Sequence, residues 1–494
     1  MRRTVYLETF GCQMNVLDSD LVLSQLRAHG YEQVDERDGA DVVIFNTCSV
    51  REHAEQKVWS RLGELRPAKL RRPEMVIGVI GCMAEREGES MFRKYPHIDV
   101  LCGPAELDKL PGMVHNAVIT NAQASPFGPK RQVALMGSTG RRSSTLAAAE
   151  DTLELLDLSR TVSPGDEISQ AYVRITRGCN KFCTYCVVPY TRGAEVHRPP
   201  QNIIEEVRKL VDAGAKEVTL LGQTVNHYHY EHGDGRKTSF AELLVMIHDA
   251  TLDLPRLRFV TSFPRDFTTE ALQAMRDCPR ICRYLHIPAQ SGSDRLLRMM
   301  NRGYTSQQYI ELIDRARAMM PDISLASDFI VGFPSETEED HQKTMDLIRH
   351  CRFKNSFIFK YSPRPGTTAI DRYEDDIPDE TKRRRNNEML AVQQAVSAGL
   401  NREMIGRTVE IMVEGVSKLV SRQAKAAGNI ELGWERRIIP AEPRTQLVGR
   451  TRGDQVVCFD GDPSLKGQLV DVRITDAQQM TLFAELSEPA AVTR

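Results

Sequence analysis

The sequence has almost no net charge and no long apolar run. Its 494 residues include 65 Lys and Arg and 67 Asp and Glu, for a formal net charge of −2 at pH 7. A globally basic surface is therefore excluded, and a nucleic-acid partner would have to contact a local basic patch. No apolar stretch is long enough to span a membrane, and none follows Arg2 and Arg3. We therefore expect neither a membrane span nor a secretory signal.

Cysteine, by contrast, is plentiful, with 11 residues. Because no secretory signal is expected, this number favours metal binding or catalysis over a disulfide framework. Oxygen-sensitive metal clusters fit a reducing compartment, so we expect the protein to work in the cytoplasm. The 494 residues, 41% of them hydrophobic, suffice for two or three domains, each with its own core.

Three of the cysteines stand close together in the segment Arg177-Gly-Cys-Asn-Lys-Phe-Cys-Thr-Tyr-Cys-Val. Cys179, Cys183 and Cys186 have a C-x3-C-x2-C spacing. A [4Fe–4S] cluster normally takes four thiolates, so three thiolates would leave one iron open to a small molecule. A structural zinc site needs four closed ligands, and only His197 lies within reach in the sequence. A redox pair of Cys183 and Cys186 would leave Cys179 unexplained, so a cluster is the favoured interpretation.

Continuous apolar segments alternate with helix-like segments in the first part of the chain, as in a parallel sheet covered on both faces. We expect strands at Thr4–Thr9, Asp41–Asn46, Met75–Ile80 and Ile98–Leu101. Cys12, Cys48 and Cys82 each follow one of the first three strands. Because the C-terminal ends of parallel strands lie at one edge of a sheet, the three thiols should converge as a second three-thiolate cluster site. The alternative is that each is only a small buried hydrophobic residue.

The other cysteines are harder to assign. Cys102 also follows a strand, and it is either a fourth ligand or a buried thiol. The remaining cysteines have no ligand spacing to any other group, except that Cys278 and Cys282 are four positions apart. We interpret all four as structural: Cys278, Cys282, Cys351 and Cys458.

Residues 167–400 again alternate strands and helices. The expected strands are Gln170–Thr176, Glu217–Leu221, Arg258–Ser262, Tyr284–Ile287, Leu325–Val331 and Ser356–Tyr361. Six strand–helix units are too few for the eight of a closed barrel, so a partial, open barrel is predicted, with its site at the C-terminal strand ends. Residues 121–166, rich in Ser, Gly, Ala, Pro and Arg, are expected to be a linker that follows an N-terminal domain at 1–120.

The tail, at residues 401–487, changes character. Thr408–Glu414, Gln468–Ile474 and Leu482–Glu485 alternate like short antiparallel strands, and a small β-barrel is their natural closure. The run Lys382-Arg-Arg-Arg385 is either a phosphate-binding patch or a solvated helix face. The predicted fold class is therefore α/β: an N-terminal parallel α/β sheet domain, a central partial (β/α)6 barrel and a C-terminal small antiparallel β-barrel.

The cysteine loop, with Tyr185 just before its last cysteine, resembles the signature of the radical S-adenosylmethionine (SAM) superfamily. The resemblance implies that the amino and carboxylate groups of SAM chelate the open iron of a [4Fe–4S] cluster. It also implies further SAM contacts at the strand ends of the barrel. By resemblance, the candidates for binding SAM are Tyr185, Gly222, Gln223, Ser327 and Gly332.

Along nearly its whole length the chain resembles the methylthiotransferases, which insert sulfur and a methyl group into an unactivated C–H bond. The resemblance implies a second [4Fe–4S] cluster on Cys12, Cys48 and Cys82, with Cys102 left as a buried thiol. It implies a 5′-deoxyadenosyl radical that removes hydrogen from the substrate, while the second cluster presents the sulfur. The C-terminal barrel resembles the TRAM module, an RNA-binding barrel.

The run from Gly178 to Pro199 closely resembles the bacterial tRNA branch of this family, and Tyr361-Ser-Pro-Arg-Pro-Gly-Thr also suits it. That branch adds a methylthio group to carbon 2 of N6-isopentenyladenosine at tRNA position 37. The alternatives are threonylcarbamoyl-adenosine in tRNA and an aspartate of a ribosomal protein. A more distant alternative is a non-catalytic iron–sulfur RNA-binding protein, against which the intact cysteine loop argues.

Two features depart from the family pattern. Phe263 stands where a histidine is expected, and an insertion near residues 420–443 lengthens the C-terminal barrel. The resemblance further implies a tRNA substrate, a reducing electron donor protein, and a sulfur or cluster donor system. We expect a monomer with no membrane partner.

Overall fold

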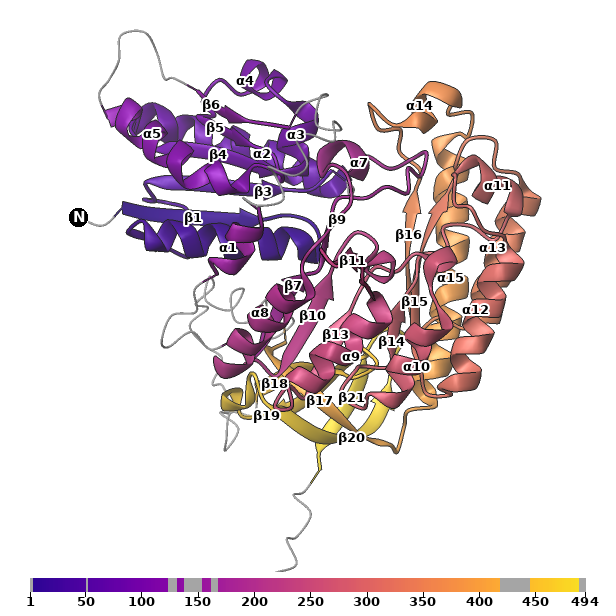
Figure 1. Ribbon diagram of the computed structural model, residues 1–494. Coiled ribbons are helices and arrows are strands. Elements are labelled where there is room, and N and C mark those ends of the chain that lie inside the picture. Colours follow the sequence, from indigo (N-terminus) through magenta and orange to yellow (C-terminus); the bar gives the residue numbers. More distant parts are fainter. Residues whose placement is uncertain are drawn as a thin grey trace, which may run out of the picture.

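Figure 1 shows the computed structural model, which describes residues 3–49, 52–122, 131–136, 153–160, 168–417 and 445–487. An N-terminal α/β body lies against one end of an open half-barrel, and a small β-barrel lies at the other end (Figure 1). The predicted insertion at 420–443 lies outside the described residues. Among the described helices, none combines the length and the apolar character that a membrane crossing requires.

The N-terminal body is built on a six-stranded sheet with the order β2-β1-β3-β4-β5-β6, and all of its pairings are parallel. Its strands are β1 (Arg3–Thr9), β2 (Tyr31–Gln33), β3 (Val42–Thr47), β4 (Val76–Gly81), β5 (Val100–Cys102) and β6 (Gln132–Ala134). Every residue of β3 and β4 is buried, as expected for parallel strands covered on both faces. The strand order reverses between β1 and β3, because β2 lies on one side of β1 and all later strands lie on the other.

Helices cover both faces of this sheet. The core on one face includes α1 (Gln13–Ala28) and α5 (Leu110–Ala122). The core on the other face includes α2 (Glu52–Arg71), α3 (Cys82–Glu87) and α4 (Ser90–Lys94). A short 3-10 turn, η1 (Leu107–Lys109), precedes α5. The segment between β4 and β5 therefore contains two short helices.

The half-barrel has six parallel strands in two groups, β7-β10-β13 and β14-β15-β16. They are β7 (Gln170–Arg174), β10 (Glu217–Leu221), β13 (Arg256–Phe259), β14 (Tyr284–His286), β15 (Ser324–Val331) and β16 (Asn355–Lys360). A parallel bridge between Leu257 and Ile281 joins the two groups. The partial, open barrel predicted from the sequence is confirmed.

Helices pack on the outside of these strands (Figure 1). They are α8 (Pro200–Asp212), α9 (Phe240–Ala250), α10 (Thr269–Asp277), α11 (Asp294–Met299), α12 (Ser306–Met319), α13 (Glu338–Cys351) and α15 (Asp379–Arg402), whereas α14 (Thr368–Arg372) lies beyond the C-terminal end of β16 (Figure 1). The shorter pieces are β8 (Thr176–Arg177), α7 (Val188–Thr191), β9 (Val196–His197), η2 (Val225–His227), β11 (His229–Glu231), β12 (Lys237–Ser239) and η3 (Pro264–Asp266). Ser239, Thr305 and Thr337 start α9, α12 and α13 with capping boxes, in which side chains satisfy the first free N–H groups.

The C-terminal strands close into a barrel with the order β17-β18-β19-β21-β20. They are β17 (Thr408–Val416), β18 (Thr445–Thr451), β19 (Val456–Gly461), β20 (Leu469–Ala477) and β21 (Leu482–Leu486), with the turn η4 (Pro463–Leu465). Arg256, at the start of β13, donates to the carbonyl oxygens of Glu410 at 2.8 Å and Arg450 at 2.9 Å. Lys354 Nζ lies 2.5 Å from Asp454 Oδ2. These contacts hold the small barrel against the N-terminal ends of the half-barrel strands.

The segment predicted as a linker, 121–166, is partly built into the fold. β6 completes the N-terminal sheet, and residues 153–160 lie where the N-terminal body meets the half-barrel. In this segment the carboxylate of Asp157 lies between Arg174 (2.5 Å), Arg198 (3.4 Å) and Arg177. Residues 123–130, 137–152 and 161–167 lie outside the described residues.

A substitution of Asp157 tests whether its carboxylate stabilises the junction between the N-terminal body and the half-barrel. An Asp157→Asn substitution should lower the free energy of unfolding by roughly 3–5 kcal/mol, because three buried guanidinium groups lose a shared counter-charge. Glu154 still pairs with Arg198 at 2.8 Å, so the lower end of that range is expected. Chemical denaturation followed by circular dichroism measures the change. A loss below about 1 kcal/mol, the value of an exposed pair, would contradict a structural role.

The matched control is Asp20→Asn, because the side chain of Asp20 is 44% exposed and lies 3.6 Å from Arg160. Burial alone would raise the pKa of Asp157, but the charges of Arg174, Arg177 and Arg198 outweigh it and lower the pKa below its usual range. The stabilisation is therefore complete above the unfolded carboxyl pKa of about 3.9 and is lost as the pH falls toward the folded value. Wild type should lose more stability in acid than Asp157→Asn.

The basic run Lys382-Arg-Arg-Arg385 is not a free phosphate-binding patch. Lys382 and Arg385 are 5% and 4% exposed and pair with Asp375 at 2.6 Å and Glu336 at 2.9 Å. Arg383 and Arg384 also pair with carboxylates, within or beside α15. The hypothesis of a phosphate site is therefore wrong for the two buried members, whose charges hold α15 against the half-barrel.

Candidate active site

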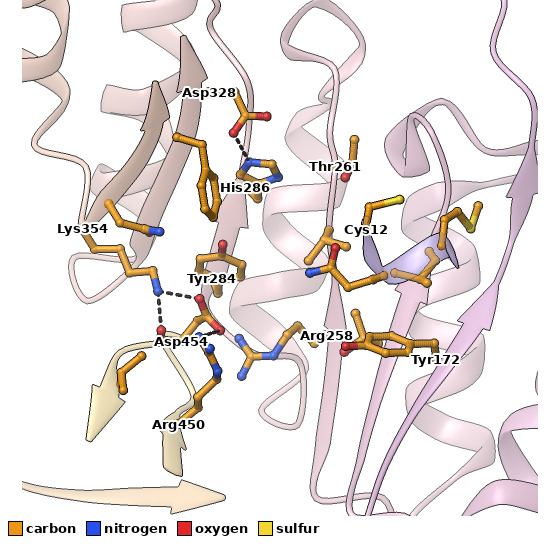
Figure 2. Close-up of a pocket in the computed structure, with 18 of the residues that line it drawn as sticks. Cys12, Tyr172, Arg258, Thr261, Tyr284, His286, Asp328, Lys354, Arg450 and Asp454 are labelled. Carbon is orange, nitrogen blue, oxygen red and sulfur yellow. Dashed lines mark hydrogen bonds and ion pairs between the residues drawn. The ribbon is translucent and has the colours of Figure 1, made fainter. Parts of the chain in front are cut away.

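A cavity of about 740 Å³ extends through the half-barrel, from the N-terminal body to the C-terminal barrel. Cys12 and Cys48 line it at one end, and Arg450 and Asp454 line it at the other (Figure 2). Residues of all six half-barrel strands, or of the loops that begin them, form the wall between these ends. The volume lies in the range of about 300–1,000 Å³ that is typical of ligand and cofactor sites.

Polar groups divide this cavity into two zones (Figure 2). Toward the C-terminal barrel, Asp454 pairs with both Lys354 at 2.5 Å and Arg450 at 3.1 Å. Burial lowers the pKa of Lys354 to about 8, and the charge of Asp454 opposes that shift. Nearer the N-terminal body, His286 Nε2 lies 3.1 Å from Asp328 Oδ1. This zone offers hydrogen-bonding groups to a polar ligand beside the cysteines.

Cys12, Cys48 and Cys82, here called the N-terminal trio, follow β1, β3 and β4. Cys12 and Cys48 therefore flank the point where the sheet order reverses, which is the usual ligand site of an open α/β sheet, and Cys82 follows the next strand. Gly11 has a φ of 130°, and a Cβ at this position would lie only 2.5 Å from the Cβ of Cys48. Glycine thus allows the loop that carries Cys12 to approach Cys48. Cys12 is also the N-cap of α1, where the helix dipole favours negative charge.

Arg192 reaches the N-terminal trio from the half-barrel. Its guanidinium donates to Asp18 Oδ2 at 2.8 Å and to Asn15 Oδ1 at 3.2 Å, and it hydrogen-bonds Cys82. Burial raises the pKa of the Cys82 thiol, and the nearby Arg192 charge partly offsets that rise. A buried cation beside thiols stabilises thiolates, or an anionic group that the thiolates hold. Sequence inspection missed Arg192, because nothing near it in the chain indicates this long-range contact.

Cys179, Cys183 and Cys186, here called the loop trio, lie in the segment between β8 and α7. Gly178 has a φ of 64°, and a Cβ there would collide with the carbonyl oxygen of Ala194, so only glycine fits. The N–H of Cys179 donates to the carbonyl oxygen of Gly193 at 3.2 Å. Because Gly193 directly follows Arg192, consecutive residues of one turn contact the two trios.

Arg302 contacts the loop trio from the other side. Its Nη1 lies 3.3 Å from Cys183 Sγ and 3.4 Å from the Tyr185 hydroxyl. The guanidinium carbon lies 4.4 Å from the centre of the Phe263 ring, a cation–π distance. Phe263, the departure from the family pattern, is therefore a buried support for the arginine that contacts Cys183. A protonated histidine at this position would repel Arg302.

The loop trio consists of thiols that need a cation to ionise. Burial raises the pKa of Cys179 to about 12, and it also raises the pKa of Cys186 above its usual range. Such thiols become thiolates at neutral pH only when a bound metal supplies the opposing charge. The loop trio therefore has the chemistry of metal ligands rather than of a reactive redox pair.

The spacing of the sulfurs distinguishes a cluster from a single ion. Two sulfurs on one zinc lie at most about 4.6 Å apart, which is twice the Zn–S bond of about 2.3 Å. Among the described residues, the sulfurs of neither trio all lie within 4.8 Å of one another. His197, which is close to the loop trio in sequence, instead joins His227 and His229 in such a group. The wider spacing of both trios fits a multi-iron cluster.

The five predicted SAM contacts fall in different places. Gly222 and Gln223 line the cavity together with Cys12 and Cys48. Tyr185 packs behind the loop trio, beside Arg302. Thr261 and His286 also line the cavity, although sequence inspection did not single out either of them. A strand-end signal was present at both positions.

Ser327 and Gly332 are not among the described residues that line the cavity. The hydroxyl of Ser327 donates to the carbonyl oxygen of Ile287 at 3.1 Å and accepts from the N–H of Ala289 at 3.0 Å. Gly332 has a φ of 67° and packs against the side chain of Lys382. In this structure both residues tie β15 to its neighbours.

The other cysteines lie apart from the trios. Cys102 is completely buried at the end of β5, and its thiol donates to the carbonyl oxygen of Glu106 at 3.2 Å. Its pKa lies well above the usual range, chiefly because of burial. The remaining four are also free and buried: Cys278, Cys282, Cys351 and Cys458.

Comparison with known proteins identifies the three bodies. Residues 4–103 match the Uncharacterized protein family UPF0004, residues 173–348 the Radical SAM superfamily, and residues 441–487 the TRAM domain. A tRNA-2-methylthio-N(6)-dimethylallyladenosine synthase of Rhodopirellula baltica is 45% identical over 493 residues, covering 100% of this chain and 97% of that protein. The chain belongs to the tRNA-2-methylthio-N(6)-dimethylallyladenosine synthase family.

Further members of this synthase family resemble the chain along its length. Proteins of the same name from Neisseria meningitidis serogroup A and Syntrophotalea carbinolica are each 39% identical, covering 98% of this chain and 100% and 99% of the relatives. A structure of the radical S-adenosylmethionine methyltransferase TsrM from Kitasatospora setae matches with a TM-score of 0.53 at 15% identity, covering 75% of this chain and 77% of that chain. At that identity the likeness supports the radical SAM fold alone.

Proposed function

We propose that this protein is a radical SAM enzyme that adds a methylthio group to carbon 2 of N6-isopentenyladenosine at position 37 of tRNA. The observation that carries the proposal is the pair of cysteine trios on either side of the turn Arg192–Gly193, in a chain that belongs to this synthase family. The expected product requires both a radical source and a sulfur donor near one substrate. Cys12 and Cys48 of the N-terminal trio line one end of the cavity, and the loop trio lies across the turn Arg192–Gly193 from them, which supports that requirement.

The cofactors of the proposal are [4Fe–4S] clusters and SAM. The loop trio would hold one cluster, with its open iron for SAM, and the N-terminal trio would hold the other. Buried thiols with raised pKa, wider sulfur spacing than zinc needs, and an arginine beside each trio all support this ligation. When bound, these groups supply the electron, the 5′-deoxyadenosyl radical and the sulfur, which no side chain provides.

The protein's own residues position and isolate the reaction. Arg192 and Arg302 each place a buried positive charge beside one trio, which balances the thiolates. Gln223 and the pair of His286 and Asp328 offer hydrogen bonds inside the cavity to the base or to SAM. The C-terminal barrel covers the opposite end of the half-barrel, which keeps bulk water from a radical at that side.

Reaching carbon 2 requires the modified adenosine to leave the anticodon stack and enter the cavity, as enzymes that act on a base generally require. We propose that the TRAM barrel contributes to holding the tRNA. An electron donor protein, a sulfur or cluster donor system, a monomeric state and a cytoplasmic location complete the proposal. The domain limits 1–120, 121–166, 167–400 and 401–487 stay predictions.

The experiment is mass spectrometry of tRNA nucleosides from cells with the gene deleted and then restored. We expect 2-methylthio-N6-isopentenyladenosine to disappear on deletion, its unthiolated precursor to accumulate, and restoration to reverse both changes. An unchanged level of this nucleoside would refute the proposed substrate. A parallel loss of the methylthiolated threonylcarbamoyl nucleoside, or of a modified ribosomal aspartate, would then identify the alternative.

A further inference from the structure

Three histidines from two separate segments converge beside the loop trio. His197 belongs to β9, His227 to η2 and His229 to β11. One ring nitrogen from each lies within 4.8 Å of those of the other two. The ring centres of His197 and His229 are 4.2 Å apart, and those of His227 and His229 are 5.0 Å apart. Imidazole nitrogens at this spacing can share one metal ion, because Zn–N bonds are about 2.0–2.1 Å long.

The hydrogen bonds of two of these histidines occupy Nδ1 and leave Nε2 available to bind a metal ion. His227 Nδ1 lies 2.8 Å from Glu195 Oε2, and His229 Nδ1 lies 2.8 Å from the carbonyl oxygen of His227. Carboxylate and carbonyl oxygens only accept, so each Nδ1 carries the proton and each Nε2 keeps its lone pair. A carboxylate or carbonyl on the far nitrogen is the usual outer support of a metal-bound histidine.

The third histidine, His197, has a ring nitrogen without a hydrogen-bond partner. His197 Nδ1 is buried and has no hydrogen-bond partner. Leaving a buried polar atom unpaired is costly, so such an atom calls for a ligand. The carboxylate of Glu195 is only 1% exposed, and it lies close enough to partly neutralise the charge of a bound cation.

We propose that His197, His227 and His229 bind one Zn²⁺ ion, which is separate from both cysteine trios. Three imidazoles and one open position suit zinc, and the absence of a carboxylate or thiolate in the group disfavours Mg²⁺ and iron–sulfur clusters. The ion joins the β8–β9 hairpin to the segment after β10. The N–H of Glu195 donates to Asn180 Oδ1 at 3.2 Å, and Asn180 directly follows Cys179. The zinc ion therefore cross-links these two segments and stabilises the surroundings of the loop trio.

The first test measures metal content and its ligands. Full-length protein, purified anaerobically with its iron and with Zn²⁺ in the growth medium, should contain about one zinc per chain. Zinc K-edge X-ray absorption should show nitrogen neighbours at about 2.0–2.1 Å and no sulfur at about 2.3 Å. Iron does not obscure this edge. A sulfur shell would mean zinc in vacant cysteine sites and would overturn the proposal, as would zinc-free protein.

The variant His229→Ala should lose zinc at least tenfold while its iron content stays unchanged, because His229 is an exposed ligand whose removal leaves the core intact. His232→Ala is the matched control: this histidine hydrogen-bonds Thr238 at 2.8 Å on the same hairpin and lies outside the trio of histidines. Equal zinc in wild type and His229→Ala would overturn the proposal.

Hydrogen exchange tests whether the zinc ion stabilises the two segments that it joins. Removing zinc from wild type with a chelator should speed amide exchange in peptides that cover residues 195–197 and 225–229, and the same treatment should leave His229→Ala unchanged. Exchange that does not respond to the chelator in wild type would overturn the structural role of the ion.

Discussion

Replacing Cys183 with alanine will abolish the reductive cleavage of SAM. Cys183 is the member of the loop trio that Arg302 contacts, and without its thiolate the proposed cluster loses a ligand and its open iron. We expect 5′-deoxyadenosine formation to fall by more than about 100-fold, the upper limit for residues that only support a ligand. Chromatography of reactions with SAM and dithionite measures the product. Iron should fall from about eight to about four atoms per chain, as two [4Fe–4S] clusters require.

Cys282→Ala is the matched control for this substitution. Cys282 is also a free, buried cysteine of the half-barrel, at 1% exposure, but its N–H donates to the carbonyl oxygen of Leu257 in β13. This control should retain all of its iron and its SAM cleavage. If Cys183→Ala forms 5′-deoxyadenosine at the rate of Cys282→Ala, the loop trio does not hold the reactive cluster.

The sequence predicted the layered parts of the fold because their signals are local. β3 and β4 are buried along their whole length, so their apolar runs mark them directly. The capping boxes at Ser239, Thr305 and Thr337 likewise mark helix starts within a few residues. The cysteines at the strand ends could be grouped because parallel topology brings those ends to one edge.

Other parts of the fold could not be predicted, because they depend on pairing across long distances. β2 and β6 are three-residue strands at the two edges of the N-terminal sheet, too short for a period to be seen. β18 was missed because Gly449 and Arg450 interrupt its apolar pattern. In the structure Arg450 pairs with Glu414 of β17, and Arg452 donates to the carbonyl oxygen of Pro279 in the half-barrel. These partners could not be known without the assembled domains.

The same distinction holds for the candidate site. The six cysteines of the two trios were predicted from spacing and strand ends, whereas Arg192 and Arg302 were not. Arg192 contacts Asp18, which is 174 positions away, and Arg302 contacts Cys183, which is 119 positions away. Side chains that balance charge across such distances leave no local pattern. The histidine group is similar, since His197 and His229 belong to different segments.

Arg192 gives the two trios a physical connection. It hydrogen-bonds Cys82 of the N-terminal trio and Asn15, while the carbonyl oxygen of its neighbour Gly193 accepts the N–H of Cys179. A change of charge at one trio therefore acts on the backbone that holds the other. This arrangement predicts two cluster sites that are chemically distinct but structurally joined, so their functions should separate when only one set of thiols is altered.

Cys82→Ala should separate them. Removing this thiol leaves the loop trio and Arg302 intact, so 5′-deoxyadenosine should still form at a rate near that of wild type. The methylthiolated nucleoside should decrease by more than about 100-fold, because the proposed sulfur-donating cluster loses one of three ligands. Mass spectrometry of one reaction mixture that contains a tRNA substrate measures free 5′-deoxyadenosine and, after tRNA digestion, the methylthiolated nucleoside. Iron should again fall to about four atoms per chain.

Cys102→Ala is the control for Cys82→Ala, because Cys102 also ends a strand of the same sheet but keeps its thiol on the carbonyl oxygen of Glu106. It should retain both products and all of its iron. Methylthiolation at the control rate in Cys82→Ala would exclude the N-terminal trio as the sulfur-delivering site. Loss of SAM cleavage together with methylthiolation would instead mean that the trios are one functional unit, coupled through the turn at Arg192 and Gly193.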